Sequence, residues 1–363
     1  MDIDTKFYTS TLLNWYQTNR RDLPWRLSNN PYEIWIAEVI FQQTRINQGI
    51  NYYHRFIERF PNISMLANAS EDEVLKLWQG LGYYSRARNL WVTAKKVAFE
   101  MQGQFPNTFS EIKKLKGIGD YTAAAIASIA FNEPVPAVDG NVIRVISRLF
   151  TIDTPASSSK GKGEITQIAH SMIPADNPGD FNQALMEFGA LQCTPRSPNC
   201  EICPLKNSCL AFKLSSIEKY PLKIIKKAVR IRHFNYLVVD DGEYLLFKKR
   251  TSGDIWENLY DFPLIETPDR YEIDKLMQTP QWKKLFNTSD ICLENVSEEI
   301  IHQLSHQKII LRFYHIKITQ PLEQTYYLSI VYNHVLSLPV PIIIGNYLAN
   351  KFEIGATKKD NWI

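Results

Sequence analysis

The sequence has little cysteine, little net charge and no long apolar run. Five cysteines occur in 363 residues, and the formal net charge is only +3. No stretch approaches the roughly 18 consecutive apolar residues of a membrane-spanning helix, and the start MDIDTKFYTS does not resemble a signal peptide. These absences predict a soluble cytoplasmic protein. They also mean that any affinity for nucleic acid must come from local basic clusters rather than from the total charge.

What is present predicts two folded domains. Hydrophobic residues make up 45% of the chain, with 8 Trp, 18 Tyr and 18 Phe, a composition that excludes disorder. Apolar residues recur at helical spacing in 34–46, 72–81, 121–131 and 141–150. From 233 onward β-rich runs dominate, with a hairpin signal at Asp241-Gly242 and further strands expected in 308–318 and 324–333. We therefore expect an all-α domain over 1–213 and an α+β domain over 231–363.

A basic segment joins these halves. Between 219 and 232 the run KYPLKIIKKAVRIR carries six basic residues and no acid. It fits either a linker, which we place at 214–230, or the first strand of the second domain. A solvated basic edge without a binding role is an equally simple reading of the charge.

Four of the five cysteines lie within 17 residues. Their spacing is C-x6-C-x2-C-x5-C, over Cys193, Cys200, Cys203 and Cys209. Four thiolates suit a 4Fe–4S cluster, whereas structural zinc usually shows two tight C-x2-C pairs and disulfides are rare in a reducing compartment. The spacing favours the cluster, with zinc and disulfides left as alternatives. With every ligand position filled by cysteine, a structural or electron-transfer role is expected.

A glycine turn precedes one of the predicted helices. Gly117 and Gly119 in LKGIGDYTAAAIASIA permit a tight turn, and the helix that follows offers free N–H groups to an anion. This is the pattern of a helix-hairpin-helix, which holds a DNA phosphate without reading sequence. The alternative is a simple turn between helices.

Two carboxylates stand in contrasting settings. Asp139 in PAVDGNVIRVISRL is predicted to cap a helix, with Asn141 just inside it, so hydrogen bonds would favour its ionised form. Glu38 lies among apolar neighbours on a helix, where burial would raise its pKa. The alternative for Asp139 is that it only caps the helix. The alternative for Glu38 is that it lies at the edge of a buried apolar stripe without a catalytic role. A protonated acid beside an ionised carboxylate is the pair that glycosidic-bond cleavage needs.

These motifs together resemble the helix-hairpin-helix DNA glycosylases that carry an iron–sulfur cluster, over about residues 10–213. In the endonuclease III branch, a lysine two positions after the second hairpin glycine forms a Schiff base. Here that position is Tyr121, so a monofunctional glycosylase is implied. DLPWR (22–26), WIAEVIFQQT (35–44), GLGYYSRARNL (80–90) and FNQALMEFGALQCT (181–194) are similar to the adenine DNA glycosylases of the MutY family.

The resemblance implies roles for individual residues. Glu38 would protonate the flipped adenine, Asp139 would stabilise the sugar cation, and Tyr121 and Asn141 would support them. Base flipping is required because the bond is unreachable inside a duplex. Contacts to the adenine and its pocket are implied for Trp25, Arg26 and Gln183, and the wedge and the contacts around the opposite base for Gln43, Thr44, Leu81 and Tyr83.

The second domain resembles the Nudix-like C-terminal domain of the same family. The Glu-rich metal helix of Nudix hydrolases is missing after GDIWENLYDFPLIE, so nucleotide hydrolysis is not expected. The family senses 8-oxoguanine with a Phe-Ser-His turn. Here Ser305 and His306 match it, and Leu304 replaces the aromatic residue. An ordinary polar loop is the alternative reading of this segment.

The implied function is removal of adenine mispaired with 8-oxoguanine or guanine in double-stranded DNA, by a monomer working at the nucleoid. Two alternative functions differ from this one, the first in the target base and the second in the class of protein. One is a relative acting on another base, such as thymine opposite guanine. The other is a redox-sensing DNA-binding module without catalysis, which would have no need of the Glu38 and Asp139 pair.

Overall fold

The computed structural model describes residues 4–222, 229–286, 290–320, 322 and 326–351. The chain divides into two compact units, one of residues 1–68 with 89–226 and the other of 69–88 with 227–363. Part of the basic run 219–232 therefore lies outside the described residues. Within the described part of the chain, no helix combines the length and apolarity needed to cross a bilayer.

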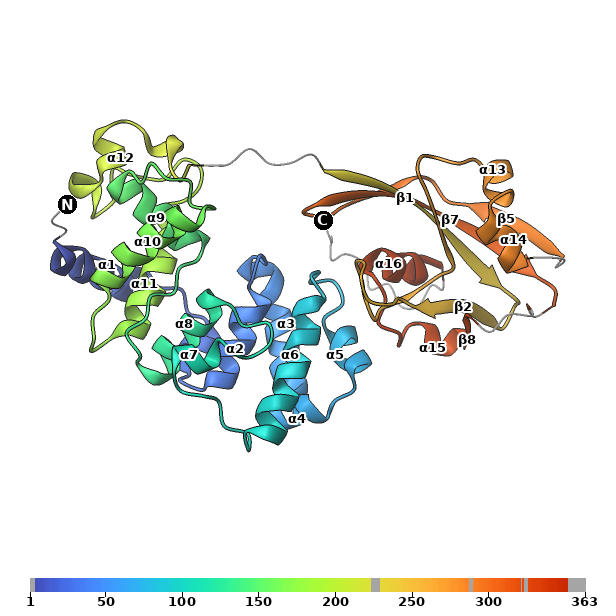
Figure 1. The fold of residues 1–363 in the computed structure, drawn as a ribbon, viewed down its shortest axis with the longest axis horizontal. Coiled ribbons are helices and arrows are strands. Elements are labelled where there is room, and N and C mark those ends of the chain that lie inside the picture. Colours follow the sequence, from blue (N-terminus) through green and yellow to red (C-terminus); the bar gives the residue numbers. More distant parts are fainter. Residues whose placement is uncertain (1–3, 223–228, 287–289, 321, 323–325, 352–363) are drawn as a thin grey trace. The chain divides into compact units, whose positions relative to one another are not determined.

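The first unit is helical (Figure 1). Its helices that frame the site are α1 (Thr5–Asn19), α2 (Pro31–Ile40), α3 (Ile46–Arg59), α8 (Asp120–Phe131), α9 (Gly140–Phe150), α10 (Ser159–Met172) and α11 (Pro178–Leu191). Helices α4 (Ile63–Asn68), α7 (Phe109–Ile112) and α12 (Leu210–Lys213) are shorter, and α6 (Ser85–Lys95) begins in the second unit and ends in the first. The predicted helices over 121–131 and 141–150 are confirmed. The one over 34–46 is too long, because α2 ends at Ile40 and a turn follows.

Helix α9 lies at the centre of the core of the first unit. Val142, Val145, Ile146 and Leu149 recur at helical spacing, and all are buried among residues of α1, α10 and α11. This apolar stripe fixes the rotation of α9 about its own axis. The N-terminus of the helix, where Asp139 is the cap, is thereby held in one orientation.

The second unit is built on a sheet. Its described residues form eight strands, in the order β3-β2-β1-β7-β5, with β4 beside β1, β6 beside β7 and β8 beside β2. The strands are β1 (Arg230–Asp240), β2 (Tyr244–Lys249), β3 (Tyr260–Asp261), β4 (Leu264–Thr267), β5 (Ile291–Val296), β6 (Ile300–Gln303), β7 (Gln307–Ile318) and β8 (Leu328–Val331). The hairpin predicted at 241–242 joins β1 to β2. β1 runs parallel to β7, and the sheet is mixed.

Both faces of the sheet are covered, which explains why β1 is buried continuously from Phe234 to Asp240. Phe234 and Tyr236 pack with α15 (Tyr332–Val335) and α16 (Ile342–Lys351), whereas Leu237 and Val239 pack with α13 (Ile273–Met277) and α14 (Pro280–Phe286). Successive residues of a strand point to opposite faces, so a strand covered on both sides is apolar throughout. The α+β prediction for this half is confirmed.

The second unit also contains a helical segment from early in the chain. Helix α5 (Glu71–Leu77) begins at the cap Ser70, whose hydroxyl accepts from the Glu73 N–H at 3.1 Å. Residues 78–84 then form an irregular turn ahead of α6. Residues 69–88 therefore belong by their contacts to the β-sheet half.

Glycine at 117 is required by the fold, and this yields a prediction. Gly117 has φ of +79°, and a Cβ there would lie 2.5 Å from the Asn89 Cβ. Gly119 has φ of −91°, and a Cβ there meets nothing within 4 Å. We expect Gly117→Ala to lower the free energy of unfolding by about 1–3 kcal/mol, with Gly119→Ala nearly neutral, measured by denaturant titration. Equal effects of the two substitutions would contradict this account of the turn.

Candidate active site

Three helix ends meet at one cavity in the first unit. Glu38 lies in the last turn of α2, Tyr121 in the first turn of α8, and Asp139 caps α9. The cavity has a volume of about 610 Å³. Its walls also include Asn141, Trp25, Arg26, Gln183 and Thr44, so eight of the residues singled out from the sequence gather here.

A short hydrogen bond joins the first two groups. The Tyr121 hydroxyl donates to Glu38 Oε2 at 2.5 Å. Burial, together with the nearby charge of Asp139, raises the pKa of Glu38 from its usual 4.5 to about 7, although the Tyr121 hydrogen bond opposes that shift. At neutral pH this carboxyl therefore exists in both protonation states and can act as an acid.

Asp139 is held by a different set of donors. Its Oδ1 accepts from the backbone N–H groups of Asn141 at 2.9 Å and Val142 at 2.8 Å, and its Oδ2 accepts from Asn141 Nδ2 at 2.7 Å. Burial raises the pKa of Asp139, although these three hydrogen bonds oppose that shift, as expected of a helix cap. The donors still distinguish the pair. Three N–H groups favour an ionised Asp139, whereas Glu38 accepts one hydroxyl.

The far wall of the cavity combines an aromatic stack with a buried ion pair. Trp25 stacks on Phe41 with ring centroids 4.5 Å apart. Arg26 makes two hydrogen bonds to the Glu187 carboxylate, at 2.9 and 2.7 Å. Gln183 accepts from the Tyr16 hydroxyl at 3.2 Å, which fixes its amide beside the cavity.

The sequence analysis missed Glu187. This residue is 1% exposed and lines the cavity. Burial alone would raise its pKa, but the hydrogen bonds from Arg21 and Arg26 prevail and hold the pKa of Glu187 at about 2. Helical spacing could have indicated Glu187, because it lies four residues after Gln183 on α11 and residues four apart lie on the same face of a helix.

Two buried arginines, Arg144 and Arg148, bind the cysteine loop, and Arg144 also connects it to the cavity. Arg144 Nη2 donates to Asn141 Oδ1 at 2.8 Å and to the Gly189 carbonyl at 2.7 Å, while its Nε donates to the Cys193 carbonyl at 2.8 Å. Helices α9 and α11 approach closely at this point, since a Cβ at Gly189 would lie 2.6 Å from the Asn141 Cβ. Only glycine fits there. Sequence spacing gave no reason to expect these arginines inside the protein.

The four clustered cysteines line one cavity with Arg148. Arg148 is 2% exposed and donates to the carbonyls of Thr194 at 2.7 Å and Pro195 at 3.2 Å, and to Cys193 Sγ at 3.3 Å. The four thiols are not joined in disulfides. Burial raises the pKa of Cys203 to about 11, so a thiolate at that position needs a strongly cationic partner. Four converging soft donors fit an iron–sulfur cluster.

The predicted hairpin glycines lie apart from the cavity. Gly119 is the N-terminal cap of α8, and the following Asp120 pairs with Lys113 at 2.5 Å and Lys162 at 2.9 Å.

Gln43, from the predicted wedge, is exposed and has φ of +60°, a backbone conformation that few residues other than glycine adopt.

A second cavity, of about 310 Å³, lies within the second unit. Leu81, Tyr83, Ser305 and His306 all line it, together with Leu304 and Trp256. Tyr83 is 44% exposed and has φ of +47°. The aromatic residue expected at 304 is absent, but Trp256 and Tyr83 supply aromatic rings to the same cavity.

Arg86 has a local structural contact. Its guanidinium donates to the carbonyls of Leu81 at 3.3 Å and Gly82 at 3.2 Å and lies 5.3 Å from the Trp78 ring centroid. Arg86 therefore braces the turn that carries Leu81 and Tyr83. The neighbouring Tyr84 is buried.

Two family models match the chain. Residues 36–171 match the HhH-GPD superfamily base excision DNA repair protein, and residues 193–209 match the iron-sulfur binding domain of endonuclease III. The second match spans the four cysteines from Cys193 to Cys209 and supports the 4Fe–4S cluster over the zinc and disulfide alternatives.

Relatives at 36–43% identity cover between 56% and 96% of the chain. The adenine DNA glycosylase of Buchnera aphidicola subsp. Acyrthosiphon pisum is 37% identical over 360 residues, which is 96% of this chain and 100% of the relative. That of Buchnera aphidicola subsp. Schizaphis graminum is 36% identical, over 82% of this chain and 84% of the relative. The human adenine DNA glycosylase is 43% identical over 56% of this chain and 39% of its own.

Solved structures match the helical half. A thermostable thymine-DNA glycosylase aligns with a TM-score of 0.54 and 30% identity, over 58% of this chain and 97% of its own. A non-covalent endonuclease III–DNA complex aligns with a TM-score of 0.51 and 24% identity over 59% of this chain and 99% of its own, which shows a shared fold. Cavity, cysteine loop and relatives agree, and the chain belongs to the adenine DNA glycosylase family of base excision DNA repair enzymes.

Proposed function

We propose that this enzyme excises adenine paired with 8-oxoguanine, or with guanine, from double-stranded DNA. The observation that carries the proposal is the Glu38 carboxyl in the first cavity, with a pKa raised to about 7 and with Asp139 lining the same cavity. The flipped adenine enters this cavity. Glu38 donates a proton to its five-membered ring, the base leaves, and the ionised Asp139 stabilises the cation that develops on the sugar. Water from the solvent then adds to that sugar carbon and loses a proton, which leaves an abasic site.

The surrounding residues have supporting roles in this proposal. Tyr121 orients the Glu38 carboxyl through its hydrogen bond, and Asn141 orients Asp139. Trp25, Arg26 and Gln183 bind the base. None of the described residues lining the cavity is a lysine, which supports a monofunctional enzyme, because a Schiff base needs an amine.

The opposite base is read elsewhere. We assign Leu81, Tyr83, Ser305 and His306 to the recognition of 8-oxoguanine, since they share the second cavity, and Gln43 and Thr44 to the wedge. The backbone at Gly117 and Gly119 holds a phosphate. On this proposal residues 1–213 form the glycosylase domain, 214–230 the linker and 231–363 a Nudix-like lesion-recognition domain, in a monomer that works at the nucleoid.

The cluster has a supporting role. Cys193, Cys200, Cys203 and Cys209 hold it, and when bound it supplies a rigid cross-link among four thiolates and a redox centre. This chain's own residues then transmit that rigidity, since Arg148 and Arg144 bind the carbonyls of the loop and Arg144 also binds Asn141.

A single-turnover assay on a duplex with adenine opposite 8-oxoguanine tests the proposal. We expect strand cleavage only after alkali, which reveals abasic sites. Glu38→Gln should slow base release at least about 10³-fold while affinity for the duplex is retained. Glu33→Gln, on the same helix in its first turn, is the matched control and should react normally. Cleavage without alkali, or a preference for thymine opposite guanine, would contradict the proposal.

The unfolding temperature of Glu38→Gln, compared with the wild type over a range of pH, shows whether the variant folds and whether Glu38 is buried as described. The pKa of Glu38 is raised on folding, so its ionisation destabilises the native state as pH rises from about 4.5 to about 7. The amide does not ionise. Above pH 7 the variant should therefore unfold at a higher temperature than the wild type, and near pH 4 the difference should shrink.

Tyr121→Phe tests the proton donor through its pH profile. The hydrogen bond from Tyr121 lowers the pKa of Glu38, so its removal should raise that pKa. The reaction needs protonated Glu38, and the single-turnover rate should fall as pH rises through the pKa. We expect the midpoint of this alkaline limb to lie near pH 7 in the wild type and at higher pH in the variant. A midpoint moved to lower pH would exclude Glu38 as the donor.

Arg148→Met tests how the cysteine loop is held. The variant keeps an unbranched, flexible side chain but leaves the carbonyls of Thr194 and Pro195 without their donor, at a cost of roughly 3 kcal/mol or more. We expect less iron per chain and weaker binding to duplex DNA. Lys213→Met, at an exposed position of α12, is the control. Full iron content and unchanged DNA affinity in Arg148→Met would rule out this role.

A further inference from the structure

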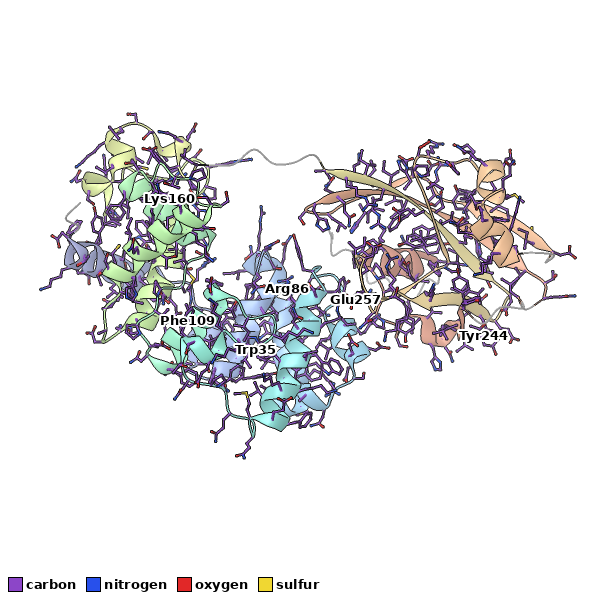
Figure 2. The ribbon with its side chains drawn as sticks, viewed as in Figure 1. Trp35, Arg86, Phe109, Lys160, Tyr244 and Glu257 are labelled. Atoms are coloured by element: carbon purple, nitrogen blue, oxygen red, sulfur yellow. The ribbon has the colours of Figure 1, made fainter. Side chains whose placement is uncertain are left out.

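The segment 69–88 and the β-sheet half are joined by a set of polar contacts inside the second unit. Arg88 Nη1 donates to the Glu257 carbonyl at 2.7 Å, and its Nη2 pairs with Glu257 Oε2 at 3.0 Å. The Arg88 side chain is 17% exposed and that of Glu257 is 31% exposed. This partial burial makes the pair stronger than an exposed one. Glu257 is labelled in Figure 2.

Helix α5 makes the second group of contacts. Asp72 accepts from Lys249 Nζ at 2.6 Å and from the Tyr260 hydroxyl at 3.0 Å. Glu71 accepts from Asn258 Nδ2 at 2.7 Å. The acidic first turn of α5 thus contacts β2, β3 and the loop between them. We call these contacts and the Arg88–Glu257 pair the latch.

The loop of residues 253–258 is the target of the latch and is conformationally demanding. Trp256 and Asn258 have φ of +60° and +63°, values that cost free energy in residues other than glycine. Arg250, the residue after β2, stabilises the loop through the Ile255 carbonyl at 2.9 Å and the Asp254 carboxylate at 2.8 Å. The latch holds its other side, at Glu257 and Asn258.

The two sides of the latch are also the two sides of the second cavity. Leu81 and Tyr83 come from segment 69–88, whereas Trp256 comes from the held loop and Ser305 and His306 from the turn before β7. Any loosening of the latch would separate these walls. Because a preformed cavity does not have to be assembled at the moment of binding, holding the walls together increases affinity for whatever enters it.

We infer that the latch preassembles the pocket for the opposite base before DNA binds, and that Asp72 and Glu257 are positioning residues for the discrimination of 8-oxoguanine from guanine. The inference rests on the proposed function of the second cavity. Neither carboxylate has a role in base release, so the latch acts on which opposite base is accepted.

The test compares the full-length wild type with the double variant Asp72→Asn, Glu257→Ala. Single-turnover rates are measured for adenine opposite 8-oxoguanine and opposite guanine. We expect the ratio of the two rates to fall about tenfold, equivalent to about 1.4 kcal/mol. Glu272→Ala is the control, since Glu272 pairs with Arg270 and Arg312 outside the latch, and it should leave the ratio unchanged.

Amide hydrogen exchange without DNA gives an independent readout. The N–H groups of Leu81 and Asn258 are hydrogen-bonded to Trp78 and Arg250 carbonyls, so their exchange reports opening of the two walls. The double variant should exchange faster in 78–86 and 253–259 than the wild type, with 140–150 in α9 unchanged.

The outcomes separate the latch from the function on which it rests. If the double variant keeps the full rate ratio while Ser305→Ala reduces it, the latch is not a specificity device and the inference is overturned. If the wild type itself does not distinguish 8-oxoguanine from guanine, the proposed function fails. In that case unchanged exchange in the double variant would also overturn preassembly, and faster exchange would support it.

Discussion

Two buried carboxyl groups line one cavity, burial makes the ionisation of each costly, and the fold offsets that cost unequally through its supply of hydrogen-bond donors. Asp139 receives three N–H groups at the start of α9, whereas Glu38 receives one hydroxyl from Tyr121. Burial raises the pKa of both. Ionised Asp139 further disfavours ionisation of Glu38, so the acid and the carboxylate of the proposed mechanism would both follow from this electrostatic arrangement.

The rest of the first unit keeps these donors in place. The buried stripe of α9 fixes the orientation of its N-terminus, and Gly189 lets α11 approach closely enough for Arg144 to bind both Asn141 and the cysteine loop. The cluster ligands therefore lie at the end of a continuous set of hydrogen bonds that begins at Asp139. A metal centre with no open coordination position can in this way matter to a reaction in which it takes no direct part.

Local patterns made much of this predictable. Cysteine spacing, the glycine turn before α8 and the apolar neighbours of Glu38 are encoded by residues close in sequence, and the structure gathers eight of the predicted site residues around one cavity. What could not be predicted depends on tertiary packing. The end of α2 at Ile40 and the burial of Arg144 and Arg148 have no signal in the local sequence. The salt bridge of Arg26 with Glu187 and the latch between residues 69–88 and 249–260 join residues that are far apart in the chain.

The central claim is that folding raises the pKa of Glu38 to about 7, so that a large fraction of this carboxyl keeps its proton at neutral pH. Carbon-13 labelling of glutamate side chains, with Glu38→Gln to assign the resonance, allows this carboxyl to be titrated directly by NMR in the DNA-free protein. The account predicts a midpoint near pH 7, as burial and Asp139 require. A midpoint near the ordinary glutamate value of 4.5 would mean that Glu38 is ionised at neutral pH and would contradict the division of roles between the two carboxyls.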